Sequence, residues 1–477
     1  MEEAIIKEDG IFWWNDEEIP KGHFAPESAI SGTLEISAEG KATLDLHGML
    51  SPGHPLENIF GNKEERTNPS IQGILKSSGK HALLIKPYNN GGKFRTNGIS
   101  HETFASPITL LSNKKFPKGM NSKGFYGFEV SLTNLEDWVN RESIKIERTK
   151  KTLKLHYTLP KGNSYKIKEG SLKITYDLRG PWHSSTANKT ELTETSCINI
   201  SSRKSQNLDW VTENFNRLEE LFTVLIGTST YLDWPTAKFS TKKESYTCYF
   251  HRNKTPQKPV KFTDIAVPLH IISKDFGAIF ENWRSSRESF GPGFYLLIGV
   301  MKSEKTYVEN RFVNYIWGLE SLHRNSATQE KQNEKLKEKV KRIIDSAAPK
   351  DKRWLENALR NSAEPSLKER LINIFSELPI TFKTESLNNF CKECADRRND
   401  ISHFGGTRNR NDYQDFTMEL VRKSAALQHL YHAVVLKRIG IREDIIQWWI
   451  IDGFKSYSIK ESLSAAGLKL ELPSDTE

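Results

Sequence analysis

The stretch TESLNNFCKECADRRNDISHFGG, residues 384–406, decides how the second half of this chain folds. Its apolar residues recur at spacings of three and four: Leu387, Phe390, Cys391, Cys394 and Ala395. That period predicts an amphipathic helix, which begins at Thr384 as its cap and is stopped by Gly405 and Gly406. The next place on the same stripe is occupied by Arg398.

An arginine on an apolar stripe is costly unless it contacts a carboxylate, a phosphate or an interface. Asn399 and His403 are four residues apart, so on a continuous helix they share a face beside Arg398. The helix end therefore gathers a permanent cation, an amide and a titratable imidazole. The alternative is structural: Arg398 pairs with a neighbouring acid such as Asp400, and His403 caps the helix end.

A near copy of this motif, RTNGISH, runs from Arg95 to His101. Both copies fit Arg-x-Asn-x-Ile-Ser-His, so the residue types alone do not separate them. The first copy contains an Asn-Gly step, which is a strong turn signal, and we expect its polar groups to lie in a loop between strands. A looser pattern, arginine followed by histidine, also occurs at Arg422 and His429. The context of a helix end therefore carries the assignment.

The first part of the chain alternates apolar and polar residues with a period of two. SGTLEISAEGKATLDLHG and GILKSSGKHALLIKPY each read as a β-hairpin, and SIKIERTKKTLKLHYTLP, SLKITYDL and TSCINIS continue the pattern. A helix follows near residues 207–227, and its stripe contains Phe215, Leu218, Phe222 and Leu225. The sequence predicts a β-rich domain over residues 1–273, built as a sheet or a sandwich.

From about Lys274 onward the apolar residues keep a period near 3.6. Stripes around Phe276 and Phe312 are followed by the charged segment EKQNEKLKEKVKRIID, two shorter helical stretches and a long helix from about Asp415 to Ile439. These features predict an all-α domain over residues 274–477. The fold class is therefore α+β, with a β-rich domain followed by a helical bundle.

Composition sets broad limits on function. Lysine and arginine total 69 against 60 acids, giving a net charge of +9, which permits a polyanionic partner without requiring one. The four cysteines and the acidic, leader-free start predict a cytoplasmic protein, and no apolar run is long enough to span a membrane. Cys391 and Cys394 form a C-x-x-C pair on the apolar stripe, which favours core packing over zinc binding.

The helix-end motif resembles that of the HEPN superfamily (higher eukaryotes and prokaryotes nucleotide-binding), whose helical domains carry Arg-Asn-x-x-x-His or close variants. The order of a β-rich domain and then a helical domain is similar to that of the ApeA-type phage-defence proteins. Arg398, Asn399 and His403 match the family pattern, and Glu320 is the candidate for the acidic residue that members often carry on an earlier helix. Glu320 can otherwise be read as a surface glutamate.

The resemblance implies a metal-independent endoribonuclease without a cofactor, which acts as a homodimer or larger homo-oligomer through its helical domain. It also implies a role in phage defence. Because an unrestrained ribonuclease would poison its host and the β-rich domain has no recognisable catalytic set, we expect that domain to act as the sensor in abortive infection, with a phage protein as the trigger. A helical insertion near residues 326–378 departs from a minimal HEPN domain. Because specific RNA readers favour single-stranded loops, a tRNA anticodon loop is the first candidate substrate. The alternative is a non-catalytic RNA-binding or sensor adaptor protein.

Overall fold

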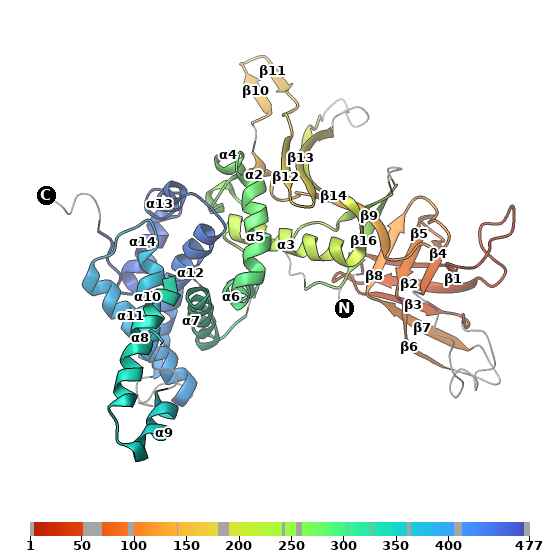
Figure 1. The fold of residues 1–477 in the computed structure, drawn as a ribbon. Coiled ribbons are helices and arrows are strands. Elements are labelled where there is room, and N and C mark those ends of the chain that lie inside the picture. The colour runs from red at the N-terminus through yellow and green to blue at the C-terminus, as the bar shows by residue number, and fades with distance from the viewer. Residues whose placement is uncertain are drawn as a thin grey trace. The chain divides into compact units, whose positions relative to one another are not determined.

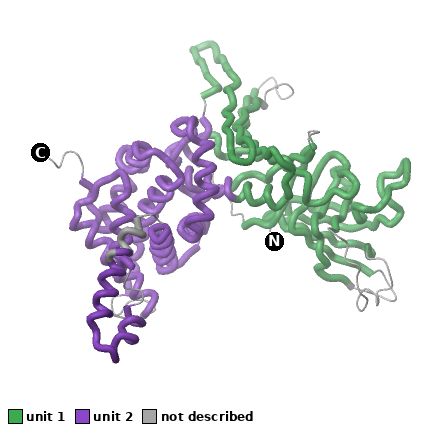
Figure 2. Tube along the Cα trace, viewed as in Figure 1, with its two compact units in different colours: residues 1–136, 141–216, 231–258 green, residues 137–140, 217–230, 259–477 purple. Residues whose placement is uncertain are grey.

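The computed structural model describes residues 4–50, 69–93, 100–140, 142–179, 190–240, 244–253, 260–303, 305–325, 328–359, 364–404 and 413–471. A β-rich region is followed by a helical region, so the predicted α+β class is confirmed (Figure 1). The chain divides into two compact units, coloured separately in Figure 2. Unit 1 comprises residues 1–136, 141–216 and 231–258; unit 2 comprises residues 137–140, 217–230 and 259–477.

Unit 1 is built on one long antiparallel sheet. Its strands, in their order across the sheet, are β12 (Asn163–Ile167), β13 (Gly170–Arg179), β14 (Thr193–Asn207), β9 (Lys123–Ser131), β15 (Thr236–Phe239), β16 (Glu244–Phe250), β8 (Ile108–Ser112), β5 (His81–Ile85), β4 (Ser70–Leu75), β1 (Ile6–Trp14), β2 (Ile30–Ile36), β3 (Ala42–Leu46), β7 (His101–Ser106) and β6 (Tyr88–Lys93). A separate two-stranded ribbon pairs β10 (Ile144–Arg148) with β11 (Leu153–Tyr157).

The hairpins predicted from the period of two are confirmed by the strand register. Strand β2 pairs with β3, and β4 pairs with β5, each in antiparallel fashion. On β2, Leu34 and Ile36 are fully buried, and on β3 the same is true of Leu44 and Leu46. Alternate side chains point to opposite faces of a strand, so these residues form one core while their neighbours face solvent.

Unit 2 is helical. Its elements are α2 (Glu136–Val139), the second half of α3 (Leu208–Ile226), the 3-10 helix η1 (Phe262–Asp264), α4 (Leu269–Ile272), α5 (Phe276–Phe290), α6 (Pro292–Lys302), α7 (Val308–Arg324), α8 (Thr328–Asp345), α9 (Pro349–Ala358), α10 (Leu367–Ser376), α11 (Thr384–Phe404), α12 (Tyr413–Arg438), α13 (Glu443–Ile451) and α14 (Ser456–Ala465). Within the described ranges, none of these helices has the length and hydropathy needed to cross a bilayer.

The core of unit 2 includes residues that come from the β-rich half of the sequence. Trp138 on α2 is 0% exposed, and its indole ring lies 4.7 Å from the ring of Phe222 and 5.5 Å from that of Phe276. Its Nε1 donates a hydrogen bond to the carbonyl of Val267 at 2.9 Å. The compact helical unit therefore contains residues 137–140, 217–230 and 259–273, which the sequence-based division placed in the first domain.

The segment near residues 326–378 has two structural parts. α10 packs against α7 and α11, and Leu371, Ile374 and Phe375 on it are buried, so it belongs to the bundle. α8 and α9 pack against each other, and no residue of α9 is fully buried. Within the segment read as an insertion, only the α8–α9 hairpin therefore lies outside the packed bundle, and α10 is part of the bundle core (Figure 1).

Two buried histidines make the stability of unit 2 depend on pH. Burial lowers the pKa of His323 and that of His432 to about 4. The unfolded chain titrates near 6.5, so between these values it binds protons that the folded chain cannot, and the free energy of unfolding decreases as pH falls from about 6.5 to 4. We expect a loss of roughly 2 kcal/mol for each histidine across this window.

Urea unfolding of the full chain at pH 7.5 and pH 5 measures this effect. His432→Gln is expected to lose less stability on acidification than the wild type, because glutamine does not titrate. An equal loss in the wild type and His432→Gln would contradict the assignment.

Candidate active site

Helix α11 positions the predicted site: it begins at Thr384, the residue expected as its cap, and is described as far as Phe404, while the expected stop at Gly405 and Gly406 lies outside the described residues. Phe390, Cys391 and Cys394 on its inner face are buried, and α11 packs there against α10 and α7. Burial raises the pKa of Cys391 to about 12 and that of Cys394 well above its ordinary value, so both thiols stay protonated. No His, Cys, Asp or Glu cluster suited to a metal ion occurs in the described parts of the chain.

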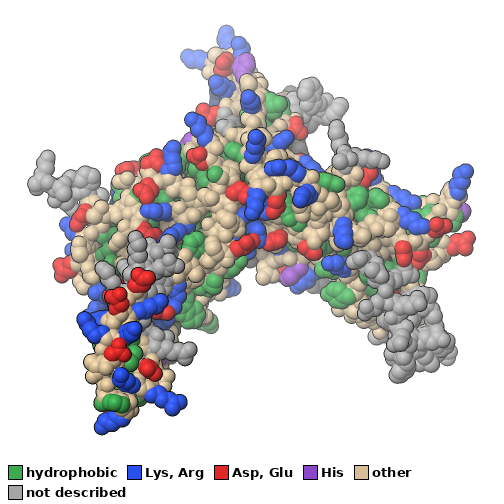
Figure 3. Space-filling model, viewed as in Figure 1, with side chains coloured by type: hydrophobic (Ala, Val, Ile, Leu, Met, Phe, Trp, Pro, Cys, Tyr) green, Lys and Arg blue, Asp and Glu red, His purple; other side chains and the backbone are tan. Residues whose placement is uncertain are grey.

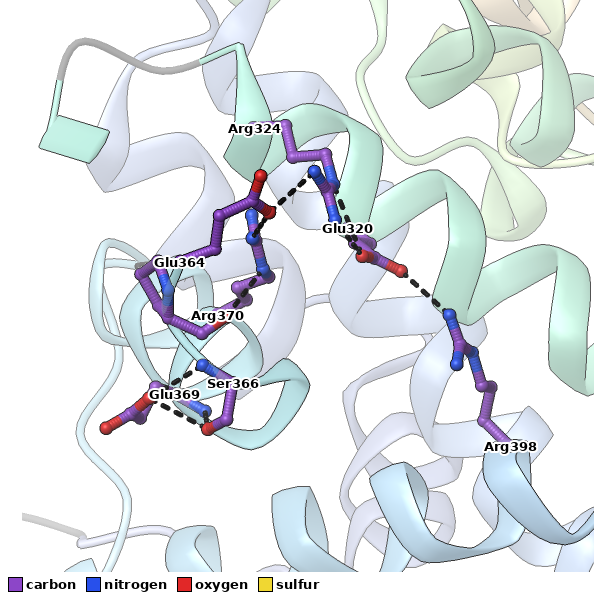
Figure 4. Close-up of polar contacts among 8 residues, drawn as sticks. Glu320, Arg324, Glu364, Ser366, Glu369, Arg370 and Arg398 are labelled. Carbon is purple, nitrogen blue, oxygen red and sulfur yellow. Dashed lines mark hydrogen bonds and ion pairs between the residues drawn. The ribbon is translucent and has the colours of Figure 1, made fainter. Parts of the chain in front are cut away.

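Arg398 reaches from α11 to a carboxylate on α7. Its Nη2 lies 3.4 Å from Oε2 of Glu320 (Figure 4). Its Nη1 donates a hydrogen bond to Oδ1 of Asn399 at 3.1 Å. Its buried Nε has no hydrogen-bond partner among the described residues. The structure thus brings together Arg398, Asn399 and Glu320.

Glu320 belongs to a chain of alternating charges. Arg324, one turn later on α7, donates to its Oε1 from Nη2 at 2.9 Å and from Nε at 3.3 Å. Nη1 of Arg324 lies 2.7 Å from Oε2 of Glu364, which also accepts from Nη2 of the buried Arg370 at 2.5 Å (Figure 4). The Glu320 side chain is mostly buried between two guanidinium groups, so it is not a free surface glutamate.

The neighbouring arginine has a different partner. Arg397 pairs with Oδ2 of Asp400 at 3.0 Å and with Oε2 of Glu419 on α12 at 2.8 Å. Residues three apart on a helix are neighbours and residues two apart are not, which explains why Asp400 pairs with Arg397 rather than with Arg398. The structural alternative for Arg398, an ion pair with Asp400, is therefore not what forms.

His403 lies in the last described turn of α11 and is exposed. It follows Asn399 by four residues, which corresponds to about 6 Å along a helix axis. Among the described residues it makes no hydrogen bond or ion pair with Arg398, Asn399 or Glu320. Among the described residues, nothing therefore holds the imidazole against the arginine.

The two other histidines that fit a similar sequence pattern, His101 and His429, lie in different structural surroundings from His403. His101 is the first residue of β7 and lies opposite Lys93 of β6, while residues 94–99, which include Arg95 and Asn97, lie outside the described ranges. His429, from the looser pattern, packs against Trp449, and burial lowers its pKa to about 4. Neither histidine lies at the exposed end of a helix.

Sequence reasoning missed three members of the charge chain. Arg324 could have been found, because it follows Glu320 by four residues on one helix face. Glu364 and Arg370 both lie within the segment read as an insertion, so no local spacing connects them to Glu320. His323 was also missed: it is buried, and its Nε2 lies 3.4 Å from Nδ2 of Asn373 on α10.

A helical bundle with this motif at the end of an inner helix defines a HEPN-type domain, and the Apea-like HEPN family model matches residues 313–445. The ApeA N-terminal domain 1 model matches residues 7–283, more than half of the chain. The chain therefore belongs to the ApeA family. Its HEPN domain is of the kind found in ribonuclease-like defence proteins. No curated protein and no solved structure matches the chain.

Proposed function

We propose that this protein is a metal-independent endoribonuclease of anti-phage defence, and that Arg398, Asn399, Glu320 and His403 form its catalytic site. The observation that supports the proposal most directly is the Arg398–Glu320 contact between α11 and α7. It fixes the guanidinium near the end of the helix that also carries the exposed His403. A cation and an imidazole are the two groups that phosphodiester cleavage needs for charge stabilisation and proton transfer.

The RNA would supply its own nucleophile, the 2′-hydroxyl. Its oxygen attacks the adjacent phosphorus, the bond to the leaving 5′ oxygen breaks, and the products are a 2′,3′-cyclic phosphate and a 5′-hydroxyl. Arg398 offsets the charge that develops on the phosphoryl oxygens. Glu320 holds the guanidinium in place, and Asn399 orients either the phosphate or the arginine.

The reaction needs both a base for the 2′-hydroxyl and an acid for the leaving oxygen. One chain supplies one His403, so we propose that a homodimer brings two copies of this histidine to a shared cleft. Exposed apolar side chains lie on the helices that surround the site: Trp317 on α7, and Met418 and Val421 on α12. They are the surface that we propose for this contact.

The β-rich domain is proposed as the sensor that restrains the helical domain until a phage component binds. A ligand shifts such an equilibrium only through different affinities for the restrained and active states. The proposed substrate is an RNA with splayed, single-stranded bases, and a tRNA anticodon loop is the first candidate. The competing proposal is a non-catalytic adaptor, in which the same Arg398 cluster only grips phosphate.

A cleavage assay with the purified full-length chain separates the two proposals. With RNA and an excess of EDTA, we expect cleavage at an undiminished rate, with products that carry 2′,3′-cyclic phosphate ends. Sequencing of RNA 5′ ends in cells, with and without phage challenge, identifies the RNA and the cleaved bond. Binding of RNA without cleavage under both conditions would favour the adaptor, and loss of activity with EDTA would contradict metal independence.

A further inference from the structure

The ribbon formed by β10 and β11 has one apolar face and one charged face, and the apolar face is exposed to solvent. Its register pairs Ile144 with Tyr157, Ile146 with Leu155 and Arg148 with Leu153. Residues that pair across a ladder share a face, so one face is almost wholly apolar. Ile146 on this face is 64% exposed and Leu153 is 62% exposed.

The opposite face and the tip of the ribbon are charged. Lys145, Glu147, Lys154 and His156 alternate with the apolar residues, and Lys150 and Lys151 form the turn between the strands. From Ile144 to Tyr157 there are five lysines and arginines against one acid. Figure 3 shows that blue side chains, those of lysine and arginine, predominate at the end of the ribbon labelled β10 and β11 in Figure 1.

A two-stranded ribbon with a bare apolar face is marginal in water by itself. Here the base of the ribbon is anchored, because Oγ of Ser143 donates to Oε2 of Glu194 on β14 at 2.6 Å. The turn is closed by backbone and side-chain hydrogen bonds between Thr149 and Thr152. The local contacts keep the ribbon formed, yet they leave its apolar face in water, as is typical of a binding surface.

We propose that this face is the docking surface for an acidic partner protein, which contacts Ile146, Leu153 and Leu155 while the surrounding cations attract its carboxylates. Charge decides among the possible occupants. The ribbon carries five lysines and arginines against one acid, so the same ribbon of a second copy would be repelled at this face. Nucleic acid is disfavoured because the exposed part of the face is aliphatic and offers bases no aromatic platform.

This inference extends the proposed function, since an acidic protein docked here is the proposed trigger for the nuclease. The test uses the full-length chain with a photo-crosslinking phenylalanine analogue at position 153, or at position 154 on the opposite face as the matched control. After phage challenge, we expect one acidic protein to be joined at position 153 and at least tenfold less of it at position 154.

The joined protein is then purified and its binding to the full-length chain is measured. The double variant Ile146→Ser, Leu153→Ser should bind it at least tenfold more weakly, whereas His156→Ser on the opposite face should stay within twofold of the wild type. Adducts with RNA or with a second copy of this chain, equal yields from the two positions, or unchanged affinity of the double variant would overturn the proposal. Failure of the wild type to cleave RNA would count against the nuclease assignment alone, because the crosslink is read independently of cleavage.

Discussion

His403→Ala is expected to lower the rate of RNA cleavage by roughly 10²- to 10⁴-fold, the range that a positioned general acid or base contributes. The imidazole is exposed and makes no contact with the other site residues, so its removal should change the free energy of unfolding by about 0.5 kcal/mol or less. Cleavage of a fluorescent single-stranded RNA and thermal unfolding of the same preparations measure the two effects.

Arg398→Ala is expected to reduce cleavage by roughly 10²- to 10³-fold, because it removes the cation that faces the phosphoryl oxygens. Glu320 keeps Arg324 as a partner in this variant, so no unpaired carboxylate is left behind. Arg422→Ala is the control, since Arg422 is an exposed arginine of the same bundle that belongs to the looser pattern.

His101→Ala is the control for the histidine. It should retain wild-type cleavage, because His101 begins a strand in unit 1. A folded His101→Ala protein without activity would contradict the assignment of the site to α11. So would a His403→Ala protein with full activity.

Trp138→Ala is expected to have the largest effect on stability, roughly 3–5 kcal/mol, as for other buried tryptophans cut back to alanine. The indole is fully buried between Phe222 and Phe276, and its removal leaves a cavity in unit 2 and an unpaired carbonyl on Val267. The melting temperature of unit 2 should fall by on the order of 10 °C.

Trp354→Ala on α9 is the matched control, because that indole is 69% exposed and its removal should cost about 0.5 kcal/mol or less. Calorimetry of both variants distinguishes them. If Trp138→Ala left the helical unit as stable as the wild type, residues 137–140 would not be part of its core.

The local elements of this protein follow from short-range patterns in the sequence. The stripe from Leu387 to Ala395, with Thr384 before it and Gly405 after it, predicted the helix that the structure describes from Thr384 to Phe404. The period of two likewise predicted the β2–β3 and β4–β5 hairpins. Such patterns are readable because helix caps, turns and side-chain periods involve residues only a few positions apart.

The sequence predicted only some of the residues that form the candidate site. Arg398, Asn399 and His403 lie within one stretch of sequence, so the motif names them. The sequence did not determine which residue pairs with Arg398, because a single sequence does not show which distant acid lies next to it in the fold. Glu320 lies 78 residues away and meets Arg398 because α7 packs against α11. The ion pairs that connect Glu320 through Arg324 and Glu364 to Arg370 likewise depend on how the helices pack.

The sequence by itself determined the order of the two regions, the helix that carries the motif and the hairpins of the sheet. Only the tertiary structure decided that Arg397 forms an ion pair with Asp400, that Arg398 forms one with Glu320, and that Trp138 belongs to the core of the helical unit. The physical reason is the range of the interactions. Backbone geometry and capping act between near neighbours, whereas burial and ion pairing depend on which distant surfaces meet once apolar area leaves water.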